Sequence, residues 1–206
     1  MERVITYIDG FNLYFGMRSK GWRRYYWLDM WGFSLALLKP GQQLEYVKYF
    51  TSRVSSSPDD PDQDKRQNLY LEALGTLPQT TIYFGHYLSK TMQCRKCGAT
   101  WMKQEEKMTD VNIAMELLVD AQQDRFDTAL LISADSDLTG PVVKVRKLFP
   151  KKRVVVAFPP NRVSERLKRE ANGWINIGAD SVRNSQLPDP VVKPDGVALH
   201  KPIEWR

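Results

Sequence analysis

The alternation of short apolar runs with amphipathic segments is the feature that most restricts the fold of this chain. The apolar runs are rich in β-branched residues, so strands are expected at residues 4–8, 45–54, 80–88, 128–133, 153–158 and 174–177. Helices are expected between them at residues 12–18, 31–38, 63–74, 109–122, 138–149 and 164–171. Strands that alternate with helices of about ten residues form βαβ units. The sequence therefore predicts an α/β fold with a mainly parallel sheet.

The size of the chain fits one domain, because 206 residues of which 42% are hydrophobic can bury one α/β core with a modest appendage. We expect this domain at residues 1–182, with a small cysteine-containing hairpin inserted at 86–104. Residues 183–206 are rich in proline and are expected to form an extended tail. Such a tail is compatible with packing on the same chain, docking on a neighbour or disorder.

Charge and hydropathy favour a cytoplasmic protein that meets polyanions. No stretch approaches the roughly 20 apolar residues that cross a bilayer, and no apolar signal region follows Met1, so no membrane contact is expected. The net charge of +6 favours attraction of nucleic acid. Many basic proteins bind no nucleic acid specifically, so charge alone does not decide the matter.

Four acidic residues follow predicted strands or begin a predicted helix. Asp9 ends the first strand, while Asp135 and Asp137 follow the strand at 128–133. Asp110 lies in the first turn of helix 109–122, on its predicted core-facing stripe with Ala114, Leu117, Leu118 and Ala121. Ligands of open parallel sheets sit beyond the carboxyl ends of the strands, where these acids are expected to meet.

Clustered carboxylates raise one another's pKa unless a divalent cation neutralises them, and ligation by oxygen alone favours Mg²⁺ or Mn²⁺ over zinc. Each acid also has a purely structural explanation. Asp9 before Gly10 suits a turn, Asp110 suits a helix N-terminus, and Asp135 and Asp137 suit a loop and a helix cap. The predicted meeting of Asp9, Asp110 and Asp135 at one edge favours the metal site.

Three segments resemble the NYN domain, in the LabA-like branch of the PIN-like nuclease superfamily. They are Tyr-Ile-Asp-Gly-Phe-Asn-Leu at 7–13, Glu-Glu-Lys-Met-Thr-Asp-Val-Asn-Ile-Ala at 105–114 and Leu-Leu-Ile-Ser-Ala-Asp-Ser-Asp-Leu at 130–138. Their order and spacing carry the similarity over about residues 1–180. The resemblance implies a PIN-like Rossmannoid three-layer sandwich with metal-dependent ribonuclease activity.

The resemblance also implies site residues. Acidic metal ligands are expected at Asp9, Asp110 and Asp135, with Asn12 as a site residue beside Asp9 and Asp137 as an additional acid. The family often has glycine between its last two acids, where this chain has a serine at position 136. The expected mechanism is hydrolysis of phosphodiester bonds in single-stranded RNA, in which Mg²⁺ or Mn²⁺ activates and orients water. Asn12 and Asp137 would position that water or a second ion.

Basic and aromatic residues near these motifs suggest substrate contacts. Lys107, Arg18 and Arg162 are candidates for phosphate contacts, although such residues are more often solvated surface charges. Six aromatic residues are candidates for stacking on unpaired bases, or for covering the core: Tyr14, Phe15, Trp22, Tyr25, Tyr26 and Trp27.

Cys94 and Cys97, followed by Gly98, have the spacing of a zinc knuckle. A closed zinc site needs four ligands; His86 is a candidate third, whereas His200 lies far off in the tail. Three interpretations stay open: zinc completed by His86 or shared in a homodimer through the hairpin, an unmetallated hairpin, or a reactive dithiol. A thioredoxin-type role is disfavoured because no helix pattern begins at Cys97, and a disulfide is disfavoured in the cytosol.

Two other classes of function compete with the ribonuclease. A non-catalytic binding module on the same fold would recruit RNA or protein through its basic face. A phosphatase or a DNA-directed nuclease would use the same acids on other phosphate esters.

Overall fold

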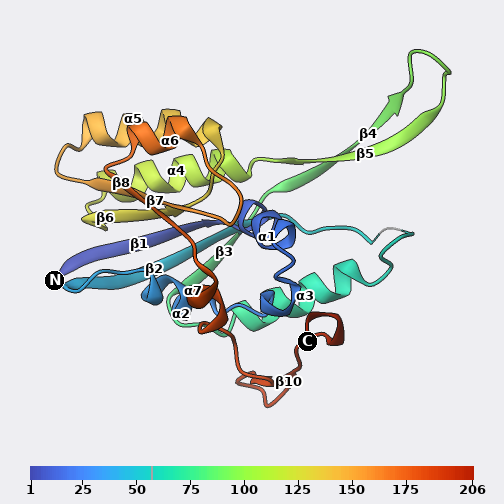
Figure 1. The fold of residues 1–206 in the computed structure, drawn as a ribbon, viewed down its shortest axis with the longest axis horizontal. Helices are drawn as coiled ribbons and strands as arrows, with labels where there is room; N and C mark the ends of the chain where they lie inside the picture. The colour runs from blue at the N-terminus through green and yellow to red at the C-terminus, as the bar shows by residue number, and fades with distance from the viewer. Residues whose placement is uncertain (57) are drawn as a thin grey trace.

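A six-stranded, wholly parallel sheet organises the protein (Figure 1). The computed structural model describes residues 1–56 and 58–206, and their side chains except those of residues 86–90 and 101–107. The strand order is β3-β2-β1-β6-β7-β8. The strands are β1 (Glu2–Asp9), β2 (Gln42–Thr51), β3 (Thr80–Phe84), β6 (Thr128–Ile132), β7 (Arg153–Phe158) and β8 (Gly173–Asn176). The predicted α/β fold with a mainly parallel sheet is confirmed.

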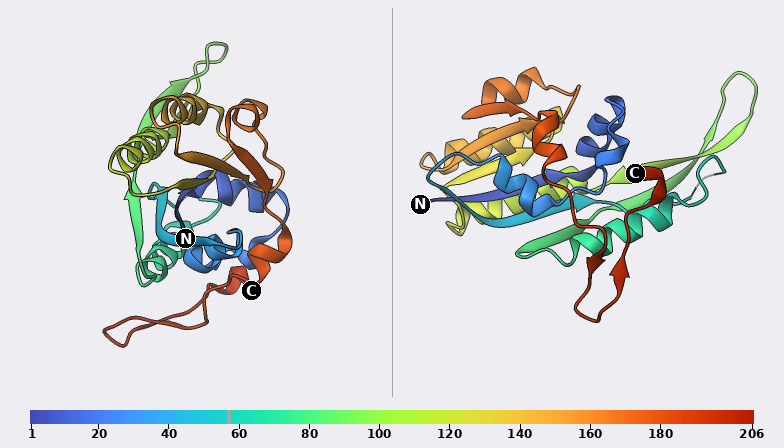
Figure 2. Two further views of the ribbon diagram at one scale, coloured as in Figure 1. Left: turned by 90° about the vertical axis from the view of Figure 1, so that its left-hand side faces the viewer. Right: turned by 60° about the horizontal axis from the view of Figure 1, so that its bottom comes forward.

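Helices cover both faces of the sheet, which gives three layers (Figures 1 and 2). One face carries α4 (Thr109–Gln122), α5 (Thr139–Leu148) and α6 (Glu165–Glu170). The other carries α1 (Gly10–Ser19), α2 (Met30–Ala36), α3 (Gln63–Leu74) and α7 (Ala179–Arg183). Strand β1 lies between the two cores and sends Val4 and Ile8 into one and Ile5 and Tyr7 into the other. Both faces being buried explains why the strands are apolar runs rather than alternating ones.

The cysteine-containing insertion is an antiparallel hairpin of β4 (His86–Gln93) and β5 (Thr100–Lys107). The predicted strand 80–88 therefore ends early: β3 stops at Phe84, and the N–H of Gly85 donates to the carbonyl of Thr51 before the chain leaves the sheet. The hairpin projects away from the body in all views (Figures 1 and 2). None of the helices in the described part of the chain is long and apolar enough to span a bilayer.

The residues after α7 pack on the same chain, which is one of the three arrangements considered for the tail. They include β9 (Val191–Val192), β10 (Ala198–Leu199) and a one-turn 3-10 helix at Ile203–Trp205. Another one-turn 3-10 helix, at Arg23–Tyr25, lies between α1 and α2. The ring of Trp205 lies 5.7 Å from that of Tyr26, 6.3 Å from Trp27 and 5.9 Å from Tyr70. The end of the tail thus covers the core between α3 and the segment that holds Tyr26 and Trp27.

We expect Trp205→Ala to lower the free energy of unfolding by about 3 kcal/mol, because it removes a large side chain that is only 8% exposed. Ile203 lies in the same turn and is 78% exposed, so Ile203→Ala should change that free energy by less than about 0.5 kcal/mol. Urea denaturation followed by tryptophan fluorescence and circular dichroism measures both. Equal effects of the two substitutions would contradict this packing of the tail.

Candidate metal centre

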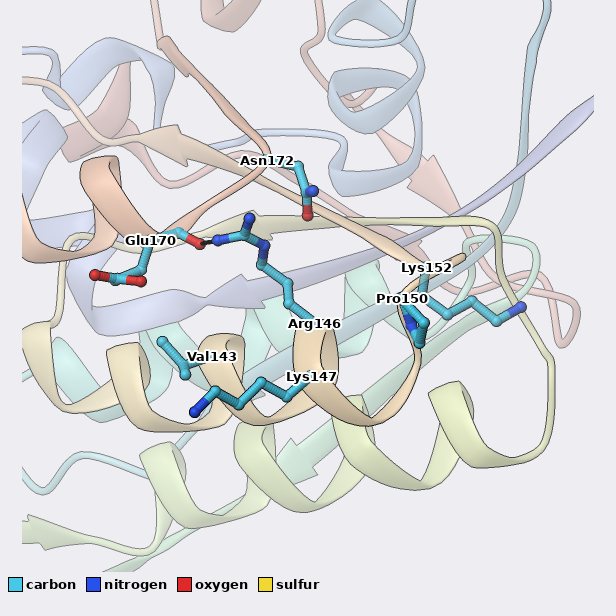
Figure 3. Close-up of a pocket in the computed structure, with 7 residues that line it drawn as sticks. All are labelled: Val143, Arg146, Lys147, Pro150, Lys152, Glu170 and Asn172. Atoms are coloured by element: carbon cyan, nitrogen blue, oxygen red, sulfur yellow. Dashed lines mark hydrogen bonds between the residues drawn. The ribbon is translucent and has the colours of Figure 1, made fainter.

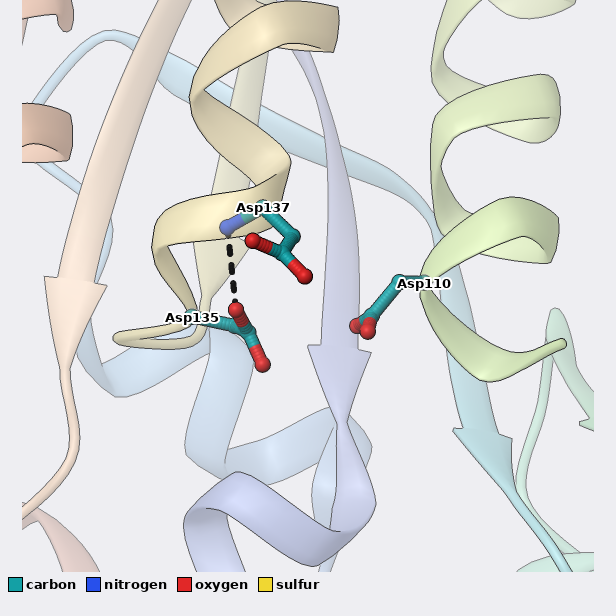
Figure 4. Close-up of side chains that lie close together, drawn as sticks. All are labelled: Asp110, Asp135 and Asp137. Atoms are coloured by element: carbon teal, nitrogen blue, oxygen red, sulfur yellow. Dashed lines mark hydrogen bonds between the residues drawn. The ribbon is translucent and has the colours of Figure 1, made fainter. Parts of the chain in front are cut away.

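Three carboxylates meet at the carboxyl edge of the sheet (Figure 4). Asp110, Asp135 and Asp137 each offer an oxygen, and these oxygens lie within 4.8 Å of one another. Asp110 comes from the first turn of α4, and the other two come from the connection between β6 and α5. Asp110 and Asp135 are half-buried and Asp137 is exposed, so the cluster opens to solvent on one side.

The strand order explains why the acids gather here. Strands β1 and β6 are neighbours, but β1 is followed by β2 on one side and β6 by β7 on the other. Such a reversal leaves a crevice beyond the carboxyl ends of the two strands, where open α/β sheets bind ligands. Asp9 ends β1 and Asp135 follows β6, so both flank this point.

Asp9 is a fourth acid at this edge and does not belong to the group of three carboxylates. It is 4% exposed and caps α1, since its Oδ1 accepts a hydrogen bond of 2.9 Å from the backbone N–H of Asn12. Its Oδ2 accepts one of 2.9 Å from the hydroxyl of Ser133. Burial raises the pKa of Asp9, the two hydrogen bonds and the charge of Arg162 act to lower it, and the charge of Asp135 acts to raise it.

Asp9 and Asn12 together hold the loop that carries Asp135. The side-chain oxygen of Asn12 accepts a hydrogen bond of 3.1 Å from the N–H of Ala134. The hydroxyl of Ser133, held by Asp9, accepts one of 3.0 Å from the N–H of Asp135. Sequence reasoning missed Ser133; its signal is a polar residue that closes an apolar strand next to an acid.

Gly10 explains why α1 starts so close to β2. A Cβ at this position would lie 2.6 Å from the ring of Tyr49 and 2.8 Å from the carbonyl oxygen of Phe50. Only glycine lets the first turn of α1 approach the strand this closely, which fixes the cap residue Asp9 at the edge.

The buried face of α4 is rotated from the predicted one. Asp110 and Ala114 are half-buried and lie at the edge of the stripe rather than at its centre. The fully buried positions are Thr109, Ile113, Leu117, Asp120 and Ala121. Asp120 is drawn inward by a buried cation, and this rotation turns Asp110 towards the crevice instead of the core.

That cation is Lys48 of β2, which is 3% exposed. Its Nζ lies 2.5 Å from Oδ2 of Asp120 and 2.6 Å from Oε2 of Glu116, both on α4. The hydroxyl of Tyr7 donates a hydrogen bond of 2.6 Å to the same Oδ2 of Asp120. These contacts fix the rotation of α4 about its own axis and its position along the sheet.

Of the residues predicted to bind phosphate, Arg162 has a charge that acts on an acid of this edge. Arg162 is half-buried and close enough for its charge to act on Asp9. Arg18 is exposed in the last turn of α1. The side chain of Lys107 lies outside the described residues.

Most of the aromatic stretch belongs to the core rather than to a base-stacking surface. Tyr26 and Trp27 are buried, and Tyr14, Trp22 and Tyr25 are half-buried against the same core. Phe15 is 43% exposed, and its ring stacks on that of Phe11 at 6.3 Å.

Two surface hollows lie at the amino edge of the sheet. One of about 410 Å³ is lined by α5, the end of α6 and the residues before β7 and β8, including Arg146, Lys152 and Asn172 (Figure 3). Another of about 270 Å³ lies among the first residues of β1, β2, β6 and β7. Neither of these two hollows includes the clustered acids.

The hairpin carries Cys94 and Cys97 at its tip as free thiols. His86 stands at the base of the hairpin, paired with Lys107, and its side chain lies outside the described residues. Strands rise by about 3.3 Å per residue, so the eight residue steps from His86 to Cys94 span roughly 26 Å. This separation argues against the expected completion of a zinc site by His86. His200 lies 3.4 Å from Asp189 in the tail.

The NYN domain family model matches residues 3–178. This chain belongs to the NYN domain family. NYN domains lie within the PIN-like nuclease superfamily and are generally nucleases that need a divalent metal. The match includes the segments of Asp9, Asp110 and Asp135, on which the resemblance was based.

Two individual proteins are also similar. The 6-hydroxy-3-succinoylpyridine 3-monooxygenase HspA of Pseudomonas putida (strain DSM 28022 / S16) is 25% identical over an alignment of 240 positions. The alignment covers 98% of this chain and 75% of the relative. The crystal structure of VPA0982, a protein of unknown function from Vibrio parahaemolyticus RIMD 2210633, superposes with a TM-score of 0.54 and 20% identity over 87% of this chain and 94% of that one. The latter similarity shows a shared fold alone.

We expect Asp9→Asn to keep the local structure, because asparagine also caps helices and its amide can donate to Ser133. Since burial raises the pKa of Asp9, its charged form costs folding free energy as the pH rises through that pKa. The metal-free variant should therefore be at least as stable as the natural chain at neutral pH, and the difference should shrink in acid, where the natural Asp9 is protonated.

Urea denaturation in EDTA across the acidic to neutral range measures this difference. A variant that is less stable than the natural chain at neutral pH would contradict the assigned cost of the buried charge. Ser133→Ala serves as the comparison, because it removes a partner of the carboxylate and should destabilise the chain most at neutral pH.

Proposed function

We propose that this NYN domain is a metal-dependent ribonuclease of the LabA-like branch that hydrolyses phosphodiester bonds of single-stranded RNA. The observation that carries the proposal is the meeting of Asp110, Asp135 and Asp137 within 4.8 Å at the carboxyl edge of the sheet. The fold family supports nuclease chemistry, and the geometry supports a site for it.

The donor set fits Mg²⁺ or Mn²⁺. Carboxylate oxygens are the ligands that these ions prefer, and a divalent cation offsets the repulsion among three acids. When bound, the ion supplies Lewis-acid stabilisation of the charge on the phosphate and lowers the pKa of water. Asp110 and Asp135 would hold it from opposite walls, and the exposed Asp137 would complete the set or orient water.

Asp9 and Asn12 act first as positioning residues in this proposal. They fix the Ser133 to Asp135 loop through the hydrogen bonds described above, and so set the direction of the Asp135 carboxylate. Each oxygen of Asp9 can accept more than one bond, so Asp9 is also a candidate fourth ligand.

The surroundings of the site favour a polymeric anion. The acids are open to solvent, the chain carries a net charge of +6, and Arg162 lies beside Asp9. Helix α1 starts at the site and bears the stacked pair Phe11 and Phe15, which suits unpaired bases. We place the enzyme in the cytoplasm, where free thiols such as those of Cys94 and Cys97 persist.

We expect cleavage of end-labelled single-stranded RNA with Mn²⁺ or Mg²⁺ and none with EDTA. Asp110→Asn and Asp135→Asn should each lower the rate at least about 100-fold, because loss of a direct ligand exceeds the 10- to 100-fold cost typical of outer-shell partners. Asp180→Asn is the matched control, since Asp180 is exposed in α7 and pairs with Arg183 away from the site.

The outcomes separate the competing functions. Cleavage that survives both substitutions would mark a contaminant and refute the proposal. RNA binding without cleavage, unchanged in Asp135→Asn, would indicate a binding module. Cleavage of branched DNA or of a small phosphate ester, but not of RNA, would indicate a DNA-directed nuclease or a phosphatase that uses the same acids.

A second candidate is oxygenation of a pyridine ring. It rests on the similarity to HspA, which covers 98% of this chain and so extends past the family match at residue 178. Oxygen-dependent conversion of 6-hydroxy-3-succinoylpyridine in the presence of a reductant, without RNA cleavage, would favour this candidate. The cluster of three acids and the match to the NYN family favour the ribonuclease.

A further inference from the structure

The tip of the hairpin is a tight turn built around two thiols. The N–H of Cys94 donates to the carbonyl of Ala99 at 2.8 Å, and the N–H of Gly98 donates to the carbonyl of Cys94 at 2.9 Å. Gly98 has a φ of 71°, a left-handed conformation that glycine adopts without strain. The turn brings Cys94 and Cys97 to the same end of the hairpin.

The backbone of this turn is arranged to stabilise a thiolate. The N–H groups of Cys97 and Lys96 both donate hydrogen bonds to the sulfur of Cys94, and the thiol of Cys97 also bonds with it. Backbone N–H groups that donate to a cysteine sulfur stabilise the negative charge that this sulfur carries as a metal ligand. This geometry matches a metal-binding knuckle better than a turn that only connects the two strands.

The ligand count determines how such a site is completed. A structural zinc site has four ligands at tetrahedral positions, and this chain has only two cysteines. His86 stands roughly 26 Å away by strand rise, and His200 lies in the tail beside Asp189. One tip therefore supplies half of a closed site.

We propose that the hairpin tips of two copies of this chain bind one zinc ion through Cys94 and Cys97 of each copy. The two-fold axis of the dimer would pass through the ion, so each copy presents the same pair of sulfurs to it. Cyclic dimers of this kind are the commonest homo-oligomers.

Access and charge both support a second copy as the partner. The tip projects from the body, so two tips can meet without a clash between the domains (Figure 2). A zinc ion with four thiolates carries two negative charges. Arg95 and Lys96 are exposed beside the sulfurs, so the two tips together bring four positive charges to offset them. Without that anion, these cations would repel one another and keep the tips apart.

Binding requires no redox step. Each of the four thiols loses its proton, and each sulfur forms one bond to the ion, so one Zn²⁺ releases four protons. The site is separate from the acids, because the hairpin holds it at the far end of two eight-residue strands. Zinc content and mass therefore test it independently of any RNA cleavage.

The full chain, purified under reducing conditions with zinc present, should contain about 0.5 zinc per chain and have the mass of a dimer. Elemental analysis and light scattering after gel filtration measure the two quantities. Cys97→Ser should lose the zinc and become monomeric, whereas His86→Ala should keep both the zinc and the dimer. Replacement by Co²⁺ should give the absorption of a site with four thiolates.

Removal of zinc from the natural chain with a strong chelator should also dissociate the dimer, so the test does not depend on the folding of a variant. One zinc per monomer, no zinc in the reduced protein, a dimer that persists after zinc removal, or loss of zinc in His86→Ala would each overturn the proposal. A zinc-free monomer that cleaves RNA would refute this site and leave the proposed function standing.

Discussion

The buried carboxylate of Asp9 is the group on which the geometry of the site depends. It joins the end of β1 to the first turn of α1 and to the loop after β6 through hydrogen bonds to Asn12 and Ser133. A charge that is 4% exposed is costly, and two charge-assisted hydrogen bonds offset part of that cost. Hydrogen bonds thereby link the carboxyl ends of the adjacent strands β1 and β6. Asp9 holds the hydroxyl of Ser133, and this hydroxyl in turn holds the backbone N–H of Asp135.

The opposite wall of the site depends on a second buried charge. Lys48 of β2 binds Asp120 and Glu116 of α4, and Tyr7 of β1 adds a hydrogen bond to Asp120. Removing one partner from a buried ion pair leaves an uncompensated charge, which is strongly destabilising. The network therefore ties α4 to the central strands, about two to three turns from the end that carries Asp110. Asp9 at the end of β1 therefore places Asp135, and Lys48 on β2 places the helix that carries Asp110.

Helices and strands were predicted well from the sequence, because the spacing of apolar residues within one segment is enough to recognise them. Helices 63–74 and 109–122 were expected within the bounds observed, and the parallel sheet follows from the alternation of strands and helices. The predicted buried face of α4 was right at Leu117 and Ala121 and wrong at Asp110 and Ala114. The helix is rotated because its buried Asp120 is paired with Lys48, 72 residues away. A charged residue indicates an exposed position unless its partner is known. The packing of Trp205 on Tyr70 and the bond from Ser133 to Asp9 are contacts of the same long-range kind.

The hairpin can be inserted next to the site because its pairing is self-contained. All eight residue pairs of β4 and β5 are made with each other, so the insertion takes no bond from the central sheet. Its return strand ends at Lys107, and the next residue, Met108, has a φ of 81° that turns the chain sharply into α4. Such a conformation is uncommon for a residue with a side chain and persists only where its surroundings impose it. Here the Lys48 network fixes α4, so the turn at Met108 absorbs the change of direction and Asp110, two residues later, keeps its place in the crevice.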